Sequence, residues 1–192
     1  MARAGMADLI AELRGLGNAS TNDFEIAGVT YWTDDQLEAV LDGTRVDFVR
    51  VALAPETDYS GTTAVYTRYR IPYRWVELPA SGTDAWKIED GDGNVIDPAT
   101  YSVNWRTQTV SFSTDQGGEV RTLTGRAFDL YRAAANVWRR KAAWAAPRFD
   151  IRERVDLELK RTQVYEHCLR QAAYFEALAG PISVQMVRGD EA

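Results

Sequence analysis

Apolar residues recur at steps of three and four residues in four parts of the chain, a spacing typical of helices with one buried face. Leu9, Ile10, Leu13 and Leu16 show the pattern near the N-terminus, where glycines follow it. The pattern predicts four helices, over residues 7–16, 34–54, 124–146 and 164–178.

The second predicted helix has a clear start signal. Thr33 offers a hydroxyl at the N-cap and Gln36 occupies the third helical position, a pair that satisfies two backbone donors. The apolar spacing continues to Ala54, and Pro55 is expected to end the helix. An extended segment that turns at Gly28 is expected just before it.

In the middle third of the chain the apolar period changes to about 2, which is the period of strands. Alternate residues from Val65 to Ile71 would share one strand face. Turn sequences rich in Gly and Asp, at residues 90–94 and 115–118, separate further runs of this kind. The predicted strands cover residues 65–71, 75–78, 86–89, 101–105, 109–113 and 120–122.

Together these elements predict a single α+β domain. Its core is expected to be a helical bundle of three to four helices, with a small antiparallel β-rich insertion between the second and third helices. The core would comprise residues 1–55 and 123–180, the insertion residues 59–122, and a C-terminal tail residues 181–192.

Composition narrows the class of protein. Apolar residues make up 45% of the 192 residues and charged residues 26%, as in globular proteins. No apolar run approaches the roughly 20 residues of a bilayer span, so no membrane partner is expected. Asp8 and Glu12 argue against a signal peptide, and the single Cys168 suits a reducing compartment, so folding in the cytoplasm is expected.

The net charge of -6 disfavours a protein that grips nucleic acid, because such binding needs clustered cations. DNA could still pass along an acidic surface without binding to it specifically.

Candidate chemistry is sparse, and we expect no enzyme. His167 and Cys168 are the only residues of their types, and as neighbours on a helix they point about 100° apart. Asp90, Asp92 and Asn94 have the spacing of a calcium loop, but Val95 stands where that loop needs glycine, so a hairpin turn is favoured. No phosphate-binding loop is present. No catalytic, cofactor-binding or metal-binding residue is therefore assigned, and no cofactor is expected.

Aromatic residues and arginines are abundant in the β-rich segment, and both types are enriched at protein interfaces. An equally good explanation is that the aromatic rings form the core of a thin sheet, and a platform for bases or sugars is a third one. The interface candidates are Tyr69, Tyr73, Trp75, Trp86, Trp105, Arg70 and Arg74.

The C-terminal tail supplies three more interface candidates. Ile182, Val184 and Met186 alternate with polar residues in the manner of a strand. A lone strand is unstable in water, so the tail is expected to become ordered on assembly, by adding to a neighbour's sheet edge or by docking on a partner.

Two segments carry a resemblance to a known family. The stretch IAGVTYWTDDQL at residues 26–37 opens a helix, and YRAAANVWRRKAA at residues 131–143 lies in a later one. With the order of elements around them, they resemble the head-tail connector, or adaptor, proteins of tailed phages, with the β-rich segment as an addition that smaller adaptors lack.

This resemblance implies a structural virion protein and no catalytic residue. It implies a ring, typically of twelve copies, between the portal protein and the next neck component, a stopper or tail-terminator protein. DNA would pass through the lumen without specific binding during genome ejection. The protein would be made in the host cytoplasm and reside in the virion neck.

Two other interpretations remain open at this point. The β-rich segment could be a module that binds a ligand or carbohydrate on a helical base. Alternatively, the chain could be a different neck or tail component, such as a stopper.

Overall fold

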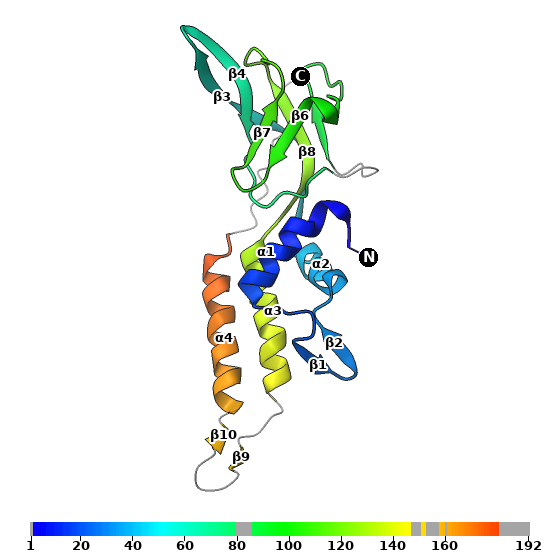
Figure 1. The fold of residues 1–192 in the computed structure, drawn as a ribbon, viewed down its shortest axis with the longest axis vertical. Coiled ribbons are helices and arrows are strands. Elements are labelled where there is room, and N and C mark those ends of the chain that lie inside the picture. Colours follow the sequence, from blue (N-terminus) through cyan, green and yellow to red (C-terminus); the bar gives the residue numbers. More distant parts are fainter. Residues whose placement is uncertain (1, 80–85, 147–150, 153–157, 160, 181–192) are drawn as a thin grey trace, which may run out of the picture.

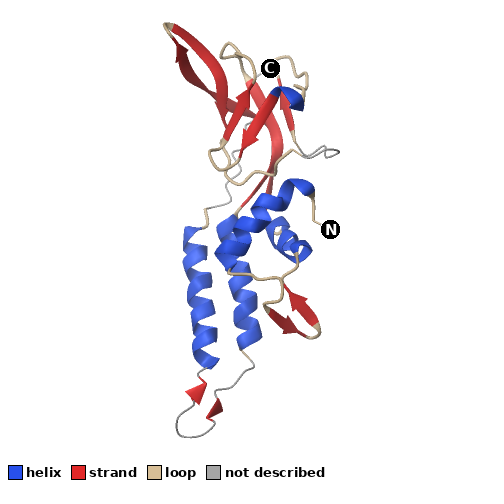
Figure 2. Ribbon diagram, in the orientation of Figure 1, coloured by secondary structure: helices blue, strands red, loops and turns tan. Residues whose placement is uncertain are grey.

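The computed structural model describes residues 2–79, 86–146, 151–152, 158–159 and 161–180. They form a helical layer and a large curled antiparallel sheet, which lie end to end along the long axis (Figures 1 and 2). None of the helices among these residues has the length and apolarity that spanning a bilayer requires.

The helical layer is organised around one central helix. α3 lies between α4 on one side and α1 with α2 on the other (Figure 1). The helices are η1 (Ala4–Met6), α1 (Ala7–Gly17), α2 (Asp34–Asp42), α3 (Leu130–Ala145) and α4 (Arg161–Leu178), and a short η2 (Pro98–Thr100) lies beside the sheet.

The main sheet has six strands in the order β5-β8-β3-β4-β7-β6, all antiparallel to their neighbours. These strands are β3 (Arg45–Ser60), β4 (Thr63–Arg70), β5 (Lys87–Glu89), β6 (Tyr101–Asn104), β7 (Thr109–Phe112) and β8 (Arg121–Phe128). Two separate hairpins join β1 (Phe24–Ile26) to β2 (Val29–Tyr31), and β9 (Ile151–Arg152) to β10 (Glu158–Leu159).

The predicted fold class is wrong, because the sheet is a major layer and not a small insertion in a helical bundle. The error lies in residues 45–53 and 124–128, which were expected to be helical. They belong instead to β3 and β8, which pair from Arg45 opposite Phe128 to Leu53 opposite Arg121. Only the start of β8 was predicted as a strand, over residues 120–122, because pairing between segments so far apart in sequence leaves little local signal.

A β-bulge explains why β3 imitated a helix. Its register with β8 shifts between Phe48 and Val51, and Arg50 within the bulge has a φ of 52°. The extra residue turns a strand's step of two into a step of three between the apolar positions. The third predicted helix also began too early, because its N-cap is Asp129, whose carboxylate accepts from the backbone N–H of Arg132 at 3.0 Å.

Several local predictions are confirmed. α1 begins at the predicted residue, and α2 begins after a complete capping box. In this box Thr33 Oγ1 accepts from the Gln36 N–H at 3.2 Å, and Gln36 Oε1 accepts from the Thr33 N–H at 2.8 Å. The extended segment before α2 is the β1–β2 hairpin, which turns at Gly28 with a φ of 80°. The predicted strand at residues 75–78 is only an isolated bridge at Val76.

The helices pack closely on α3 because small residues lie at the contacts. A Cβ at Gly17 of α1 would lie 2.8 Å from Val137 Cγ1. The Trp138 indole N–H reaches back to the Leu16 carbonyl at 3.1 Å. Lys141 is buried, donates to the Asn18 carbonyl at 2.7 Å and forms an ion pair with Asp23. This cation therefore neutralises the negative end of α1.

Charged side chains join the helical layer to the sheet. Arg3 forms ion pairs with Glu38 and Asp42 of α2 and with Glu77, whose side chain is 4% exposed. Arg126 of β8 lies 3.6 Å from the same Glu77 carboxylate. Since removal of one partner would leave a buried charge uncompensated, this network fixes the position of the N-terminus against both layers.

We expect replacement of Trp138 or Phe175 by alanine to destabilise the fold by about 3–5 kcal/mol, because both side chains are 8% exposed and belong to the core. Urea denaturation followed by circular dichroism measures the change. Tyr59→Ala is the control, since Tyr59 is 69% exposed and its loss should shift stability by less than about 0.5 kcal/mol. Equal effects of the three changes would contradict this core.

Asp115 should make stability depend on pH. Its carboxylate accepts from the backbone N–H groups of Gly117 and Tyr66, which lowers the pKa of Asp115 below its ordinary value of 3.8. The stabilisation is complete well above pH 3.8 and is lost as the pH falls through the lower pKa of the folded state. The difference in unfolding free energy between wild type and Asp115→Asn should therefore be largest at neutral pH and shrink in acid. If this difference in unfolding free energy stayed constant with pH, the charge of Asp115 would contribute nothing to stability.

Candidate functional site

The reactive side chains of the described residues do not form a catalytic set. Cys168 is buried in the contact of α4 with α3, and burial raises the pKa of its thiol. The exposed His167 has its ring edge-on to Trp138, with centroids 5.7 Å apart. No three His, Cys, Asp or Glu side chains in this part of the chain are placed to hold a metal ion.

The turn at residues 90–94 uses its carboxylate for its own backbone. Asp90 Oδ1 accepts from the N–H groups of Asp92 and Asn94 at 3.0 and 2.8 Å, and Oδ2 accepts from the Asn94 side chain at 3.1 Å. These hydrogen bonds lower the pKa of Asp90. The site is therefore a hairpin turn with its donors satisfied.

Three of the interface candidates lie in the subunit's own core. Tyr69 is fully buried, and its hydroxyl donates to the Glu119 carbonyl at 3.0 Å. The buried Trp86 and Trp105 donate their indole N–H groups to the Tyr101 hydroxyl and to Asp8, at 3.2 and 3.4 Å. These rings hold the curled sheet together and fasten it to α1, so none of the three offers a free surface.

The remaining candidates separate into two groups. Arg70, at the end of β4, is exposed and does not line the cavity described below, whereas Tyr73, Arg74 and Trp75 line it together. The tail candidates Ile182, Val184 and Met186 lie outside the described residues.

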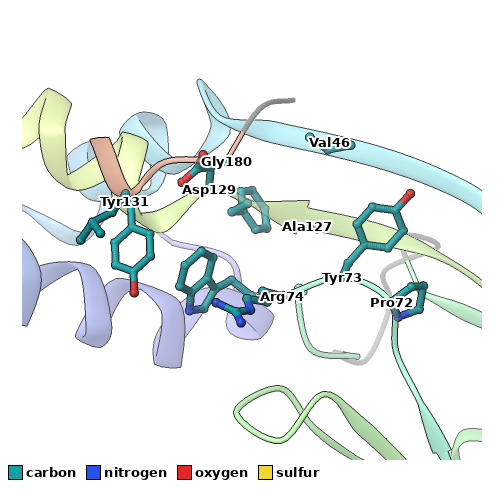
Figure 3. A pocket seen from close by; sticks show the side chains of 11 residues that line it. Val46, Pro72, Tyr73, Arg74, Ala127, Asp129, Tyr131 and Gly180 are labelled. Carbon is teal, nitrogen blue, oxygen red and sulfur yellow. The ribbon is translucent and has the colours of Figure 1, made fainter. Parts of the chain in front are cut away.

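Tyr73, Arg74 and Trp75 line a cavity of about 430 Å³ where the sheet meets the helical layer. We call it the junction cleft. Figure 3 shows Tyr73 towards one end and Tyr131 of α3 at the other, with Ala127 of β8 between them. The full lining is Val46, Pro72, Tyr73, Arg74, Trp75, Ala127, Phe128, Asp129, Tyr131, Leu178 and Gly180.

The aromatic walls of the junction cleft are held rigidly. Tyr73 stacks on Phe48 with centroids 4.4 Å apart, and Trp75 meets Tyr131 edge to face at 4.9 Å. The backbone of the segment is tied to β8, since the Trp75 carbonyl accepts from the Phe128 N–H at 3.1 Å. The walls thus keep their shape without a ligand.

Few polar groups face the junction cleft. Asp129 caps α3 and has an ion pair with Arg132, while Arg132 also donates to the Gly180 carbonyl at 3.4 Å. Arg74 is exposed and also lines the cleft. Such a lining can bind an apolar or aromatic group with a polar edge, and its carboxylate, Asp129, is already engaged by the backbone N–H and side chain of Arg132.

The outer face of α4 is a feature that the sequence analysis did not identify. Among the described elements, α3 is the only one that α4 contacts extensively. Side chains at steps of three and four residues form what we call the outer stripe: Val164, His167, Gln171, Tyr174 and Leu178. Val164, Tyr174 and Leu178 are 44%, 59% and 43% exposed. The spacing was legible in the sequence beside the more apolar buried stripe, but only the packing shows how far each side chain is covered. His167 lies against Trp138 of α3 and Leu178 borders the junction cleft, whereas Tyr174 is the most exposed of the three apolar members.

Comparisons with known proteins add no relative. No model of a known protein family matches this chain. A search of curated proteins also finds no match.

The burial of Cys168 has a chemical consequence. In the native protein its thiol should react with a thiol reagent such as DTNB at least about tenfold more slowly than in denaturant, because the reactive thiolate is disfavoured and shielded. Stopped-flow absorbance measures both rates. A rapid reaction of the native protein would show that the contact between α3 and α4 opens readily and that Cys168 is accessible enough to act as a nucleophile.

Proposed function

We propose that this protein is a structural subunit that assembles with copies of itself, and that it serves as a head-tail connector in the neck of a tailed phage. The observation that carries the proposal is the outer stripe of α4. A helix that is packed on one side only and exposes Val164, Tyr174 and Leu178 on another is typical of a subunit whose core is completed by a neighbour.

The shape of the subunit also supports assembly. The helical layer and the curled sheet lie end to end (Figure 1), so each subunit has long flanks available for side-by-side contacts. Repeated heterologous contacts of one kind close into a ring when the rotation between copies allows it. The connector proteins that the two segments resemble form rings of this kind, typically of twelve copies.

The proposed ring would lie between the portal protein and a stopper or tail-terminator protein, in the virion neck. An acidic subunit suits a lumen through which DNA slides, because phosphates are repelled there and not clamped. The described residues offer no catalytic set, and structural work of this kind needs none. Synthesis in the host cytoplasm fits the single buried cysteine.

A second candidate function is favoured by the junction cleft. A preformed cavity of about 430 Å³ with aromatic walls suits a sugar ring or another apolar ligand with a polar edge. In that case the chain would be a binding module on a helical base. A stopper role in the same particle differs from the connector role only in the partner that is bound.

The mass of the protein in solution, alone and with a portal protein of a tailed phage, tests these alternatives. We expect the purified chain to form a closed oligomer on its own or on the portal, observed by native mass spectrometry and electron microscopy. A monomer that ignores the portal but binds an oligosaccharide, with a fluorescence change that Trp75→Leu removes, would overturn the connector proposal and favour the binding module. Binding to a tail terminator without the portal would favour the stopper.

A further inference from the structure

The first half of β3 has a neighbouring strand on one side only. Residues 45–53 pair with β8, whereas β4 joins β3 only from Ala54 onwards. Within the described part of the chain, residues 45–53 have no other backbone pairing. We call the unpaired side of this segment the open edge. Its N–H and C=O groups can pair with one further strand, and natural proteins usually cover or block such edges.

The open edge begins at the junction cleft. Val46 of β3 lines the cleft, and so does Ala127, which lies opposite Val46 on β8 (Figure 3). An apolar cleft beside an unpaired strand edge is the arrangement to which extended segments bind, because main-chain hydrogen bonds and pockets for alternate side chains act together. The two features therefore form one candidate site for an added strand.

The chain leaves α4 at this cleft. Leu178 is the last residue of α4, and both Leu178 and Gly180 line the cleft. The Gly180 carbonyl accepts from the Arg132 side chain of α3 at 3.4 Å, which holds the exit point beside the cleft. Since residue 181 is bonded to Gly180, the residues that follow have a local concentration at the cleft on the order of millimolar. A free ligand at micromolar concentration competes poorly with such a tethered segment.

The sequence beyond Gly180 suits a strand in this place. Residues 181–192 lie outside the described part of the structure, and the first seven of them, PISVQMV, contain no charged side chain. Ile182, Val184 and Met186 alternate with polar residues, which is the period of a strand with one apolar face. At about 3.3 Å per residue, seven residues extend over about 23 Å, which is shorter than the open edge at about 30 Å.

The aromatic wall of the cleft contains a strained residue. Trp75 has a φ of 50°, in the left-handed region that a bulky side chain rarely adopts. Strain of this kind persists where surrounding contacts hold it, and it is typical of binding sites. The hydrogen bond from the Phe128 N–H to the Trp75 carbonyl and the contact of the Trp75 ring with Tyr131 hold it here. The wall is therefore in place before anything occupies the cleft.

We infer that residues 181–187 add to the open edge of β3 in the same subunit and direct Ile182, Val184 and Met186 towards the junction cleft. The occupant of the cleft is thus a segment of this chain. The strand addition expected of the tail takes place within one subunit and needs no neighbour. This docking does not depend on the proposed self-assembly, and it counts against a binding module whose cleft is open to a free sugar.

Hydrogen exchange of the backbone amides in residues 45–53, measured by mass spectrometry on the monomer, tests the strand addition. Ile182→Ser, Val184→Ser and Met186→Ser together remove the apolar face of the segment and keep its length. We expect exchange in residues 45–53 of this triple variant to be at least about tenfold faster than in wild type, because N–H groups at the open edge lose their partners.

The matched control changes the other face of the same segment. Ser183→Ala combined with Gln185→Ala should leave exchange in residues 45–53 as it is in wild type. A synthetic peptide of sequence PISVQMV, added to the triple variant at a concentration on the order of millimolar, should restore slow exchange, because it supplies the missing strand. Circular dichroism confirms that each variant is folded, and Val184→Ser alone replaces the triple variant if the latter is not.

A disulfide trap distinguishes docking within one subunit from docking between copies. Val46→Cys combined with Val184→Cys should form a disulfide on oxidation and remain a monomer in non-reducing electrophoresis, because both side chains would lie at the cleft. Tyr59→Cys combined with Val184→Cys is the control, since the exposed Tyr59 lies near the far end of β3, and no disulfide within one chain is expected there. The native Cys168 is buried and should not compete.

Three results would overturn the inference. If wild type and the triple variant exchange equally fast over residues 45–53, the tail does not cover the open edge. If the disulfide joins two chains, the segment docks on a neighbouring copy. If an oligosaccharide binds wild type as tightly as it binds the triple variant and changes its tryptophan fluorescence, the cleft is open to a free ligand. None of these measurements depends on assembly, so the proposed function can stand when this inference fails.

Discussion

The pairing of β3 with β8 is the interaction on which the rest of the structure depends. β3 begins just after α2, and β8 ends just before α3, so this ladder joins two inner strands of the sheet and also connects the sheet to the helices. Its contact is close: a Cβ on Gly125 would lie 2.8 Å from Phe48 Cζ, which leaves room only for glycine opposite that ring. Because both layers meet in this ladder, neither layer is a separable unit with the other as an addition.

The ladder also explains the junction cleft. β8 is bordered at its end by the segment around Val76, whose backbone continues the sheet by one bridge before the chain turns away. Tyr73 and Trp75 on this segment are thereby held against Phe48 and Tyr131, one ring from the sheet side and one from the helical side. The cleft is the space left where a curled sheet passes into a helix pair, and its aromatic walls are part of how the two layers are joined.

In the helical layer, packing is uneven. α3 is covered from both sides and buries a continuous series that includes Ala133, Ala134 and Ala135, whereas α4 buries little more than the face that contains Cys168, Ala172 and Phe175. Apolar side chains left in water at the edge of a layer lower its stability unless another surface covers them. A structural subunit satisfies this need through its neighbours, and this is the physical link between the shape of the fold and the proposed assembly. The ion pairs of Arg3 with Asp42 and Glu77, and of Lys141 with Asp23, hold the N-terminal segment against α2 and α3.

The sequence by itself determined the features that depend on neighbouring residues. The capping box of α2, the turns at Gly28 and at residues 90–94, and the core positions of Trp138 and Phe175 follow from local hydrogen bonds and from helical spacing. The tertiary structure alone decided the rest. A bulge at residues 48–51 gave a strand the apolar spacing of a helix, and only pairing with β8 shows otherwise. Likewise, the sequence marks Tyr69 and Tyr73 equally as aromatic, but the fold buries the first inside the sheet and leaves the second at a cleft. The exposure of a side chain depends on which distant segments pack against it, and that is a property of the whole chain and not of its neighbours in sequence.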